Sequence, residues 1–466
     1  MAKDIIEKIA EAPANALDKT VTGTEKIAGN LHGKETLEKS RKTIEKTRAK
    51  TKEFWHTLGP GLTTGASDDD PSGIATYSQT GAKYGFQLLW LSLVTFPMMS
   101  VVQEMCARIG LVTGRGLAGN IRLHFSKKIL YICTLLLFCA NAVNIGADLG
   151  AMAEAARLLR PEASFFLMVI IFAVFSLAMQ IFTPYEKYAK YLKWLALILF
   201  TYIFAAMMAD INWEEALRAA VTPTIVFEKE QLLLICAILG TTISPYLFFW
   251  QTSQEVEEQI VEGKTNIAQR QGASESDIKK MRADVWTGML LSNVVMFFII
   301  AACGAVLFNQ GITDINTAAE AAAALEPFAG EASQLLFAVG IIGTGLLAIP
   351  VLAGSSSYAV SESLRWRKSG LNKSLKQAHA FYGMIIISVL IGLAINFIGI
   401  DPIDALIYAA VFNGLVAPVV LALIVLMSSN KKIMGEWSNK KTTTYFGWTV
   451  TSIMALAGMA AIYSLL

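Results

Sequence analysis

Three consecutive carboxylates, Asp68, Asp69 and Asp70, are the residues best suited to chemistry in this chain of 466 amino acids, and Pro71 follows them directly. They interrupt an otherwise apolar segment. A charged side chain at the centre of a bilayer costs roughly 2.5–3.5 kcal/mol on insertion scales. Proline prevents a regular helix at that turn, and a broken helix frees backbone carbonyls and side chains to hold an ion. We therefore predict a cation site at this interruption, with Asp70 as its central ligand.

A second interruption, with the sequence Thr-Thr-Ile-Ser-Pro-Tyr, covers residues 241–246 of a later apolar segment. Asp70 offers a hard anionic oxygen, which suits Mg²⁺, Mn²⁺ and Ca²⁺. The second break adds Ser244 and Tyr246 but no Met, Cys or His, the softer ligands that favour thiophilic ions. The pair of breaks predicts a site for a hard divalent cation, with Tyr246 either in the site or packed as an ordinary aromatic residue.

The composition places the helices that carry these breaks in a membrane. Hydrophobic residues make up 54% of the chain and charged residues 16%, whereas soluble domains have about 25% charged residues. The net charge of +2 and the scattered five cysteines give no pattern for nucleic-acid binding, a disulfide framework or a zinc site. Apolar segments long enough to span a bilayer, about 20 residues each, lie near 57–82, 86–110, 129–157, 163–182, 190–209, 232–257, 285–308, 333–361, 379–399, 403–428 and 444–465.

Loop charges predict how these eleven segments are oriented. Lys and Arg gather in every second connection, and Asp and Glu in several of the others. The positive-inside rule then predicts a cytosolic N-terminus and, with an odd number of spans, an external C-terminus in the plasma (inner) membrane. Residues 1–52 lack the apolar core of a signal peptide and are predicted to be a cytosolic hydrophilic tail. A transporter core at 53–430 follows, and then a basic loop and peripheral helix at 431–466.

The two breaks fall in the first segment of each five-segment half. Corresponding interruptions in two halves are typical of inverted-repeat transporters with a binding site at the membrane midplane. We predict an all-α integral membrane fold with discontinuous helices 1 and 6. Its partners would be a divalent metal ion and the lipid bilayer, without nucleic acid, and one chain would suffice.

Further polar residues lie within apolar segments: Asn141, Asn144 and Asp148 in the third and Asn413 in the tenth. An intramembrane Asp is a functional candidate by default. For Asn, interhelical hydrogen bonds of about 0.6 kcal/mol are the alternative. We place Asp148, Asp69 and Asn413 around the predicted site, where they could also handle protons. Capping of a half-helix is the alternative for Asp69.

Several of these motifs resemble the natural resistance-associated macrophage protein (NRAMP) family of divalent-metal transporters. Gly-Pro-Gly-Leu at 59–62, Asp70-Pro71 and Tyr-Gly at 84–85 are similar to the first two helices of that family, Asp148-Leu149 to the third, and 240–253 to the sixth. The resemblance covers roughly residues 55–430. It implies a LeuT-type fold of five plus five helices, import of Mn²⁺ or Fe²⁺ usually coupled to protons, and the transported ion in place of a cofactor.

Departures from the family motifs narrow this expectation. The family sequence Asp-Pro-Gly-Asn ends here in Ser72 and Gly73, and the family sequence Met-Pro-His has become Ser-Pro-Tyr. In the third helix Ala151 stands where the family has Glu. This pattern resembles the NRAMP-related branch associated with magnesium, and it implies weak or absent proton coupling. The ligand positions that the resemblance implies are Asp70, Gly73, Thr241 through its carbonyl, Ser244 and Tyr246.

Two other functions stay open at this stage. One is a proton-coupled Mn²⁺/Fe²⁺ importer, and the other is a transporter of an organic solute, such as an amino acid, with the same fold. Three aspartates beside the break would repel the carboxylate of an amino acid, which favours the cation. The chain shows no ATP-binding loop, nucleophile elbow or HExxH motif, so we do not expect an enzyme.

Overall fold

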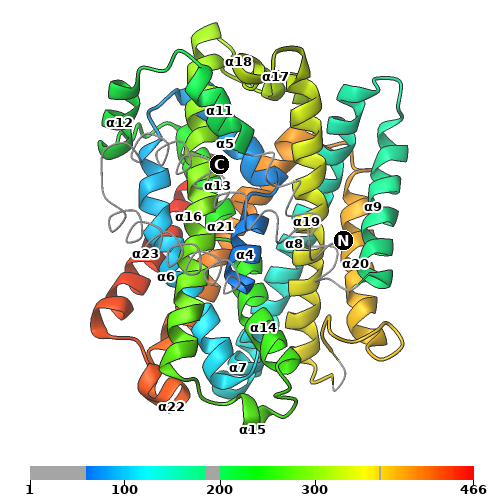
Figure 1. Ribbon diagram of the computed structural model, residues 1–466, viewed down its shortest axis with the longest axis vertical. Helices are drawn as coiled ribbons and strands as arrows, with labels where there is room; N and C mark the ends of the chain where they lie inside the picture. Colours follow the sequence, from blue (N-terminus) through cyan, green and yellow to red (C-terminus); the bar gives the residue numbers. More distant parts are fainter. Residues whose placement is uncertain (1–58, 184–199, 367–368, 466) are drawn as a thin grey trace, which may run out of the picture. The chain divides into compact units, whose positions relative to one another are not determined.

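The computed structural model describes residues 59–183, 200–366 and 369–465, and regular structure in these ranges is entirely helical (Figure 1). All of the helices given below lie in Pro60–Leu466, one of the two units of the chain. In chain order the α-helices are α4 (Pro60–Asp68), α5 (Pro71–Tyr84), α6 (Trp90–Thr113), α7 (Leu117–His124), α8 (Lys127–Leu159), α9 (Phe165–Phe182), α11 (Thr201–Met208), α12 (Trp213–Val221), α13 (Lys229–Thr242), α14 (Pro245–Val261), α15 (Ile267–Arg270), α16 (Glu275–Val306), α17 (Ala318–Ala323), α18 (Glu326–Ala329), α19 (Ser333–Ser363), α20 (His379–Ile395), α21 (Pro402–Ser428), α22 (Lys431–Met434) and α23 (Lys441–Leu465).

The predicted count of eleven spans is not confirmed. Within the described ranges, seven helical segments are long and apolar enough to cross a membrane: Lys127–Leu159, Phe165–Phe182, Lys229–Val261, Glu275–Gln310, Glu326–Ser363, Pro402–Ser428 and Lys441–Leu465. The apolar helix α20 is shorter, and the first two predicted spans are more polar because α4, α5 and α6 carry many hydroxyl, amide and charged groups. The first half of the predicted span at 190–209 lies outside the described residues, and the second half contains α11.

Both predicted breaks are present, and proline begins the second half of each broken helix. Asp70 is the N-cap of α5 in an extended conformation, with φ −72° and ψ 171°, and its side chain accepts a hydrogen bond from the Gly73 backbone N–H. Ser244 is the extended N-cap of α14, directly before Pro245. Since proline lacks a backbone donor and has a helical φ, it suits the first position of a helix. The two breaks therefore follow from the local sequence.

Close backbone packing holds α4 against α16. A Cβ on Gly65 would overlap the carbonyl of Gly288, and a Cβ on Gly288 would overlap the carbonyl of Gly61. Asp284 of α16 caps the first turn of α4 by accepting from the backbone N–H groups of Gly61 at 2.6 Å and Leu62 at 3.1 Å. The half-helix that leads to the triple aspartate is thus fixed to one neighbouring helix at its start and along its length.

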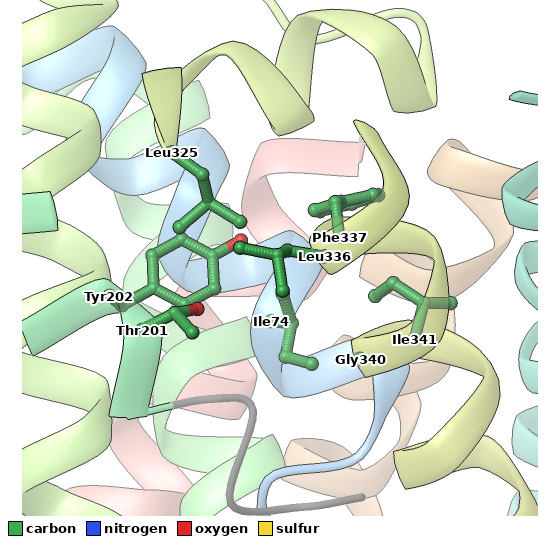
Figure 2. A pocket seen from close by; sticks show the side chains of 8 residues that line it. All are labelled: Ile74, Thr201, Tyr202, Leu325, Leu336, Phe337, Gly340 and Ile341. Atoms are coloured by element: carbon green, nitrogen blue, oxygen red, sulfur yellow. The ribbon is translucent and has the colours of Figure 1, made fainter. Parts of the chain in front are cut away.

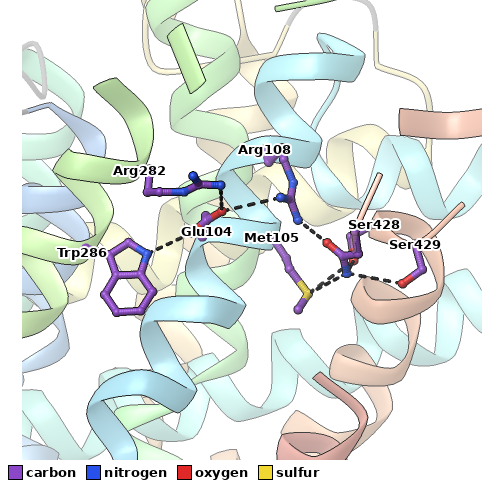
Figure 3. Close-up of polar contacts among 8 residues, drawn as sticks. Glu104, Met105, Arg108, Arg282, Trp286, Ser428 and Ser429 are labelled. Atoms are coloured by element: carbon purple, nitrogen blue, oxygen red, sulfur yellow. Dashed lines mark hydrogen bonds and ion pairs between the residues drawn. The ribbon is translucent and has the colours of Figure 1, made fainter. Parts of the chain in front are cut away.

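A polar cluster ties α6 and α16 to the segment before α23 (Figure 3). Glu104 accepts hydrogen bonds from Arg282 at 2.8 Å and from the indole N–H of Trp286 at 2.9 Å. Arg108, one turn along α6, pairs with Glu104 at 3.5 Å and donates to Asn439. The cluster lies near the end of α6 that leads into α7, so it joins three parts of the chain at one end of the bundle.

The two ends of the bundle differ in charge. Figure 1 shows α7, α15 and α22 at one end and α12, α17 and α18 at the other. The connections at the first end are rich in Lys and Arg, whereas acidic residues predominate around α12, α17 and α18. This separation has the form that the positive-inside rule describes.

The packing of α4 on α16 generates a stability prediction. Gly65→Ala should destabilise the protein by roughly 1–3 kcal/mol, the usual cost of overpacking a close contact, because the new methyl group meets the Gly288 backbone. The measurement is the Tm of purified protein in detergent. Gly383→Ala in α20 is the matched control, because a Cβ there has nothing within 4 Å. Equal Tm values for the two variants would contradict the packing argument.

Candidate cation site

Asp70 is buried at the centre of the first break, with three donors aimed at its carboxylate. Its Oδ1 accepts from Ser72 Oγ at 2.6 Å and from the Gly73 backbone N–H at 2.8 Å. Its Oδ2 accepts from Asn144 Nδ2 of α8 at 2.9 Å. A carboxylate offers about four lone-pair sites, so these donors leave capacity for one further contact. The first break therefore presents an anionic oxygen that is held in position and still able to bind a cation.

The second break meets the first at Thr241. Its Oγ1 lies 3.4 Å from Ser72 Oγ. A Cβ on Gly73 would lie only 3.2 Å from the same Thr241 oxygen and 3.4 Å from the Asp68 carbonyl. A side chain at position 73 would therefore crowd the Thr241 hydroxyl, and its absence leaves Thr241 Oγ1 and the Asp68 carbonyl close to this turn.

Ser244 and Tyr246 use their hydroxyl protons within the protein. Ser244 Oγ lies 2.6 Å from the Gly240 carbonyl and 2.8 Å from that of Thr241, as a donor to both. Tyr246 OH donates to the Ser67 carbonyl at 3.0 Å and so links α14 to the end of α4. Both oxygens keep lone pairs. Tyr246 is in direct contact with the broken helix, while Ser244 closes the last turn of α13.

Asp68 and Asp69 are directed to a different helix from Asp70. Ser292 Oγ of α16 lies 2.6 Å from Asp68 Oδ2 and 3.2 Å from Asp69 Oδ1. All three aspartates are buried. The run of carboxylates is therefore divided, with two on the α16 side and Asp70 facing α8 and the second break.

Several buried polar atoms of α8, the helix that contacts Asp70, lack a hydrogen-bond partner within the described part of the chain: both carboxylate oxygens of Asp148 and Oδ1 of Asn144. Both side-chain polar atoms of Asn413 on α21 are also buried and unpartnered there. Asp148 interacts electrostatically with Asp70. Since buried polar groups are nearly always paired, these atoms mark a region suited to water or an ion.

Two side chains that contact Asp70, Ser72 and Asn144, were not predicted as site residues. Asn144 was predicted only as one of the polar residues within the third apolar segment. The available signal was its spacing, because Asn144 and Asp148 are four residues apart and share a face of α8. Its partner Asp70 lies 74 positions away in the sequence, so no local pattern predicts the contact.

The ligand chemistry is that of a hard site. In the ranges that the structure describes, no three His, Cys, Asp or Glu residues come together as a metal cluster. Carboxylate, hydroxyl and amide oxygens are a typical environment for a cation that keeps part of its hydration shell, as Mg²⁺ does.

Two small cavities lie beside α5. The first is mainly apolar, and Figure 2 shows Ile74 between Tyr202 and Ile341 in its lining. The second shares Phe337 and Ile341 with the first and is also lined by residues of α8, α17 and α21. Residues of α5 and α19 thus line both cavities.

The chain was compared with known proteins. A family model described as natural resistance-associated macrophage protein-like matches residues 61–464. The divalent metal cation transporter MntH of Klebsiella pneumoniae subsp. pneumoniae is 24% identical over 435 residues, which are 92% of this chain and 98% of that protein. MntH of Mycobacterium tuberculosis is 25% identical over 431 residues, covering 90% of this chain and 93% of that protein.

A solved structure shares the fold. It is a manganese transporter of Eremococcus coleocola in complex with an aromatic bis-isothiourea substituted compound, with a TM-score of 0.67 at 19% sequence identity. The match covers 87% of this chain and 86% of that chain.

Proposed function

The chain belongs to the natural resistance-associated macrophage protein-like family, and from this premise we propose that it carries Mg²⁺ or Mn²⁺ across a membrane by alternating access. Membership confirms the resemblance seen in the sequence, together with the all-helical membrane fold and its discontinuous helices 1 and 6. The family is one of metal-ion transporters and not of enzymes, and the metal is cargo rather than a resident cofactor.

The observation that carries this proposal is the buried Asp70 carboxylate where the two breaks meet. Its surroundings supply further oxygens at Ser72 and Thr241, and the unpartnered oxygens of Asn144 and Asp148 lie on the neighbouring face of α8. Alternating access requires a site between two halves that move, and helix breaks at corresponding positions of the halves are where such sites lie.

The choice of Mg²⁺ or Mn²⁺ rests on ligand hardness. Ser244 precedes Pro245, and a softer side chain at this position would favour thiophilic ions. The Ser244 hydroxyl donates to the carbonyls of Gly240 and Thr241. Mg²⁺ gives up its waters reluctantly. Neutral oxygens around one carboxylate suit an ion that enters with part of its water.

We further propose that the ion's own gradient and the membrane potential drive transport. A proton relay needs a chain of titratable groups. Asp148 is the acid on α8 near the site, and Ala151 follows one turn later. The potential supplies about 2.3 kcal/mol per elementary charge per 100 mV, which is sufficient for a divalent cation without coupled protons.

Orientation follows from the charge difference between the two ends of the bundle. The basic end with α7, α15 and α22 would face the cytosol, and the acidic end with α12, α17 and α18 the exterior. In this proposed orientation the start of α4 would lie toward the cytosol and the end of α23 toward the exterior of the plasma membrane.

Asp70→Asn should abolish divalent uptake. Asn caps a helix about as well as Asp, so this variant retains the start of α5 but loses the charge. Losing a contact to a charged group costs about 1.5–3 kcal/mol, or roughly tenfold or more in affinity. The measurement is uptake into proteoliposomes that contain a Mg²⁺- or Mn²⁺-sensitive dye, with Asp70→Ala as a second variant.

Asp401→Ala is the matched control for the uptake assay. Asp401 is also an N-cap directly before a proline, accepting from the Ile403 N–H at 2.9 Å, but at the exposed start of α21. It should reduce stability and leave uptake intact. Normal uptake by Asp70→Asn would refute the assignment of the site.

Ser244→Met should shift selectivity toward Cd²⁺ and Mn²⁺, because a thioether is a softer ligand than a hydroxyl. Isothermal titration with Cd²⁺, Mn²⁺ and Mg²⁺ measures this shift. Wild-type protein that binds Cd²⁺ far more tightly than Mn²⁺ would show that the native site is not hard.

Uptake of the metal ion should leave the internal pH of proteoliposomes unchanged. A pH-sensitive dye in the lumen measures this while the metal-sensitive dye reports influx. Acidification that follows metal influx and disappears in Asp148→Asn would instead show that Asp148 carries protons.

A further inference from the structure

Asn144 has an unusual hydrogen-bonding state. It is fully buried on α8, and its amide nitrogen donates to Asp70 Oδ2 at 2.9 Å. An ionised carboxylate only accepts hydrogen bonds, so the NH₂ group of the amide must face Asp70. The carbonyl Oδ1 is consequently directed elsewhere, and it has no partner within the described part of the chain.

An unpaired buried carbonyl is costly, and most such atoms in native proteins have a partner. Oδ1 of Asn144 belongs to the same amide that holds Asp70, so a cation at Asp70 lies within reach of the Asn144 side chain. Amide oxygens are hard ligands of the kind that bind alkaline-earth ions. Asp148, one turn further along the same face, adds two more unpartnered oxygens.

We infer that Asn144 is a cation-binding residue, in which Nδ2 holds the Asp70 carboxylate and Oδ1 binds the hydrated cation. The inference deepens the proposed function and rests on it. It gives α8 a specific role, because Asn144 connects this continuous helix to the broken helix through the Asp70 carboxylate. The cation then bridges α5 and α8 as well as the two breaks.

The test measures Mg²⁺ and Mn²⁺ affinity by titration calorimetry on the purified full chain, together with its Tm. Asn144→Leu has a similar volume without polar atoms, and both affinities should fall about tenfold or more, as for loss of one contact to a charged group. Asn144→Asp has the same shape with an added charge. It should bind the divalent ion more tightly than wild type, because affinity rises with the number of charged ligands.

Asn141 provides the matched control. It lies on the same face of α8, and its Oδ1 is also unpartnered in the described residues, but its Nδ2 bonds to the Leu352 carbonyl and to Ser355 and Ser356 of α19. Asn141→Leu should lower the Tm and leave both affinities within twofold of wild type. If the role of Asn144 were purely structural, Asn144→Leu would behave like Asn141→Leu, with a lower Tm and unchanged affinities.

The outcomes separate this inference from the proposed function. If the wild-type protein binds the ions and Asn144→Leu binds them with the same affinity, the role of Asn144 is overturned and the transporter proposal still stands. Weaker binding by Asn144→Asp than by Asn144→Leu would also overturn it. If Asn144→Leu does not fold, the isosteric Asn144→Asp decides alone. Wild-type protein that binds neither ion would contradict the proposed function itself.

Discussion

The capping of α5 by Asp70 is the interaction on which the remainder of the site depends. The first N–H groups of a helix have no partner within the helix, and each unsatisfied group within a membrane costs several kcal/mol. Pro71 removes one donor, and Asp70 accepts the N–H of Gly73. The same carboxylate accepts hydrogen bonds from the side chains of Ser72 and Asn144. One side chain therefore both permits the break and supplies its negative charge.

The surrounding bundle gives the three aspartates different hydrogen-bond partners. α16 packs on α4 through glycines, caps its first turn with Asp284, and offers Ser292 to Asp68 and Asp69. Asp70 is left to face α8 and the second break. In the proposed mechanism, this division leaves the Asp70 carboxylate to the cation. The carboxamide that contacts Asp70 comes from α8, whereas the family motif has its Asn in the first helix at the position of Gly73.

Features encoded by neighbouring residues could be predicted from the sequence, including the breaks at Pro71 and Pro245 and the helical membrane fold. Features that depend on distant residues could not. The Asp70–Asn144 contact and the Asp284 cap each join separate helices, and no spacing rule connects them. Hydropathy located the apolar span at 285–308 but not the full helix. α16 begins at Glu275, because a capping box at Ser274 and Asp277 begins a polar first part of the helix.

The most direct test of the account is to locate the ion. Mn²⁺ soaked into crystals of the full chain gives an anomalous difference signal that identifies the metal without prior assumptions. The account predicts one strong peak beside Asp70, between Thr241 and the Asn144 side chain. A peak between Asp68, Asp69 and Ser292, with none at Asp70, would contradict it.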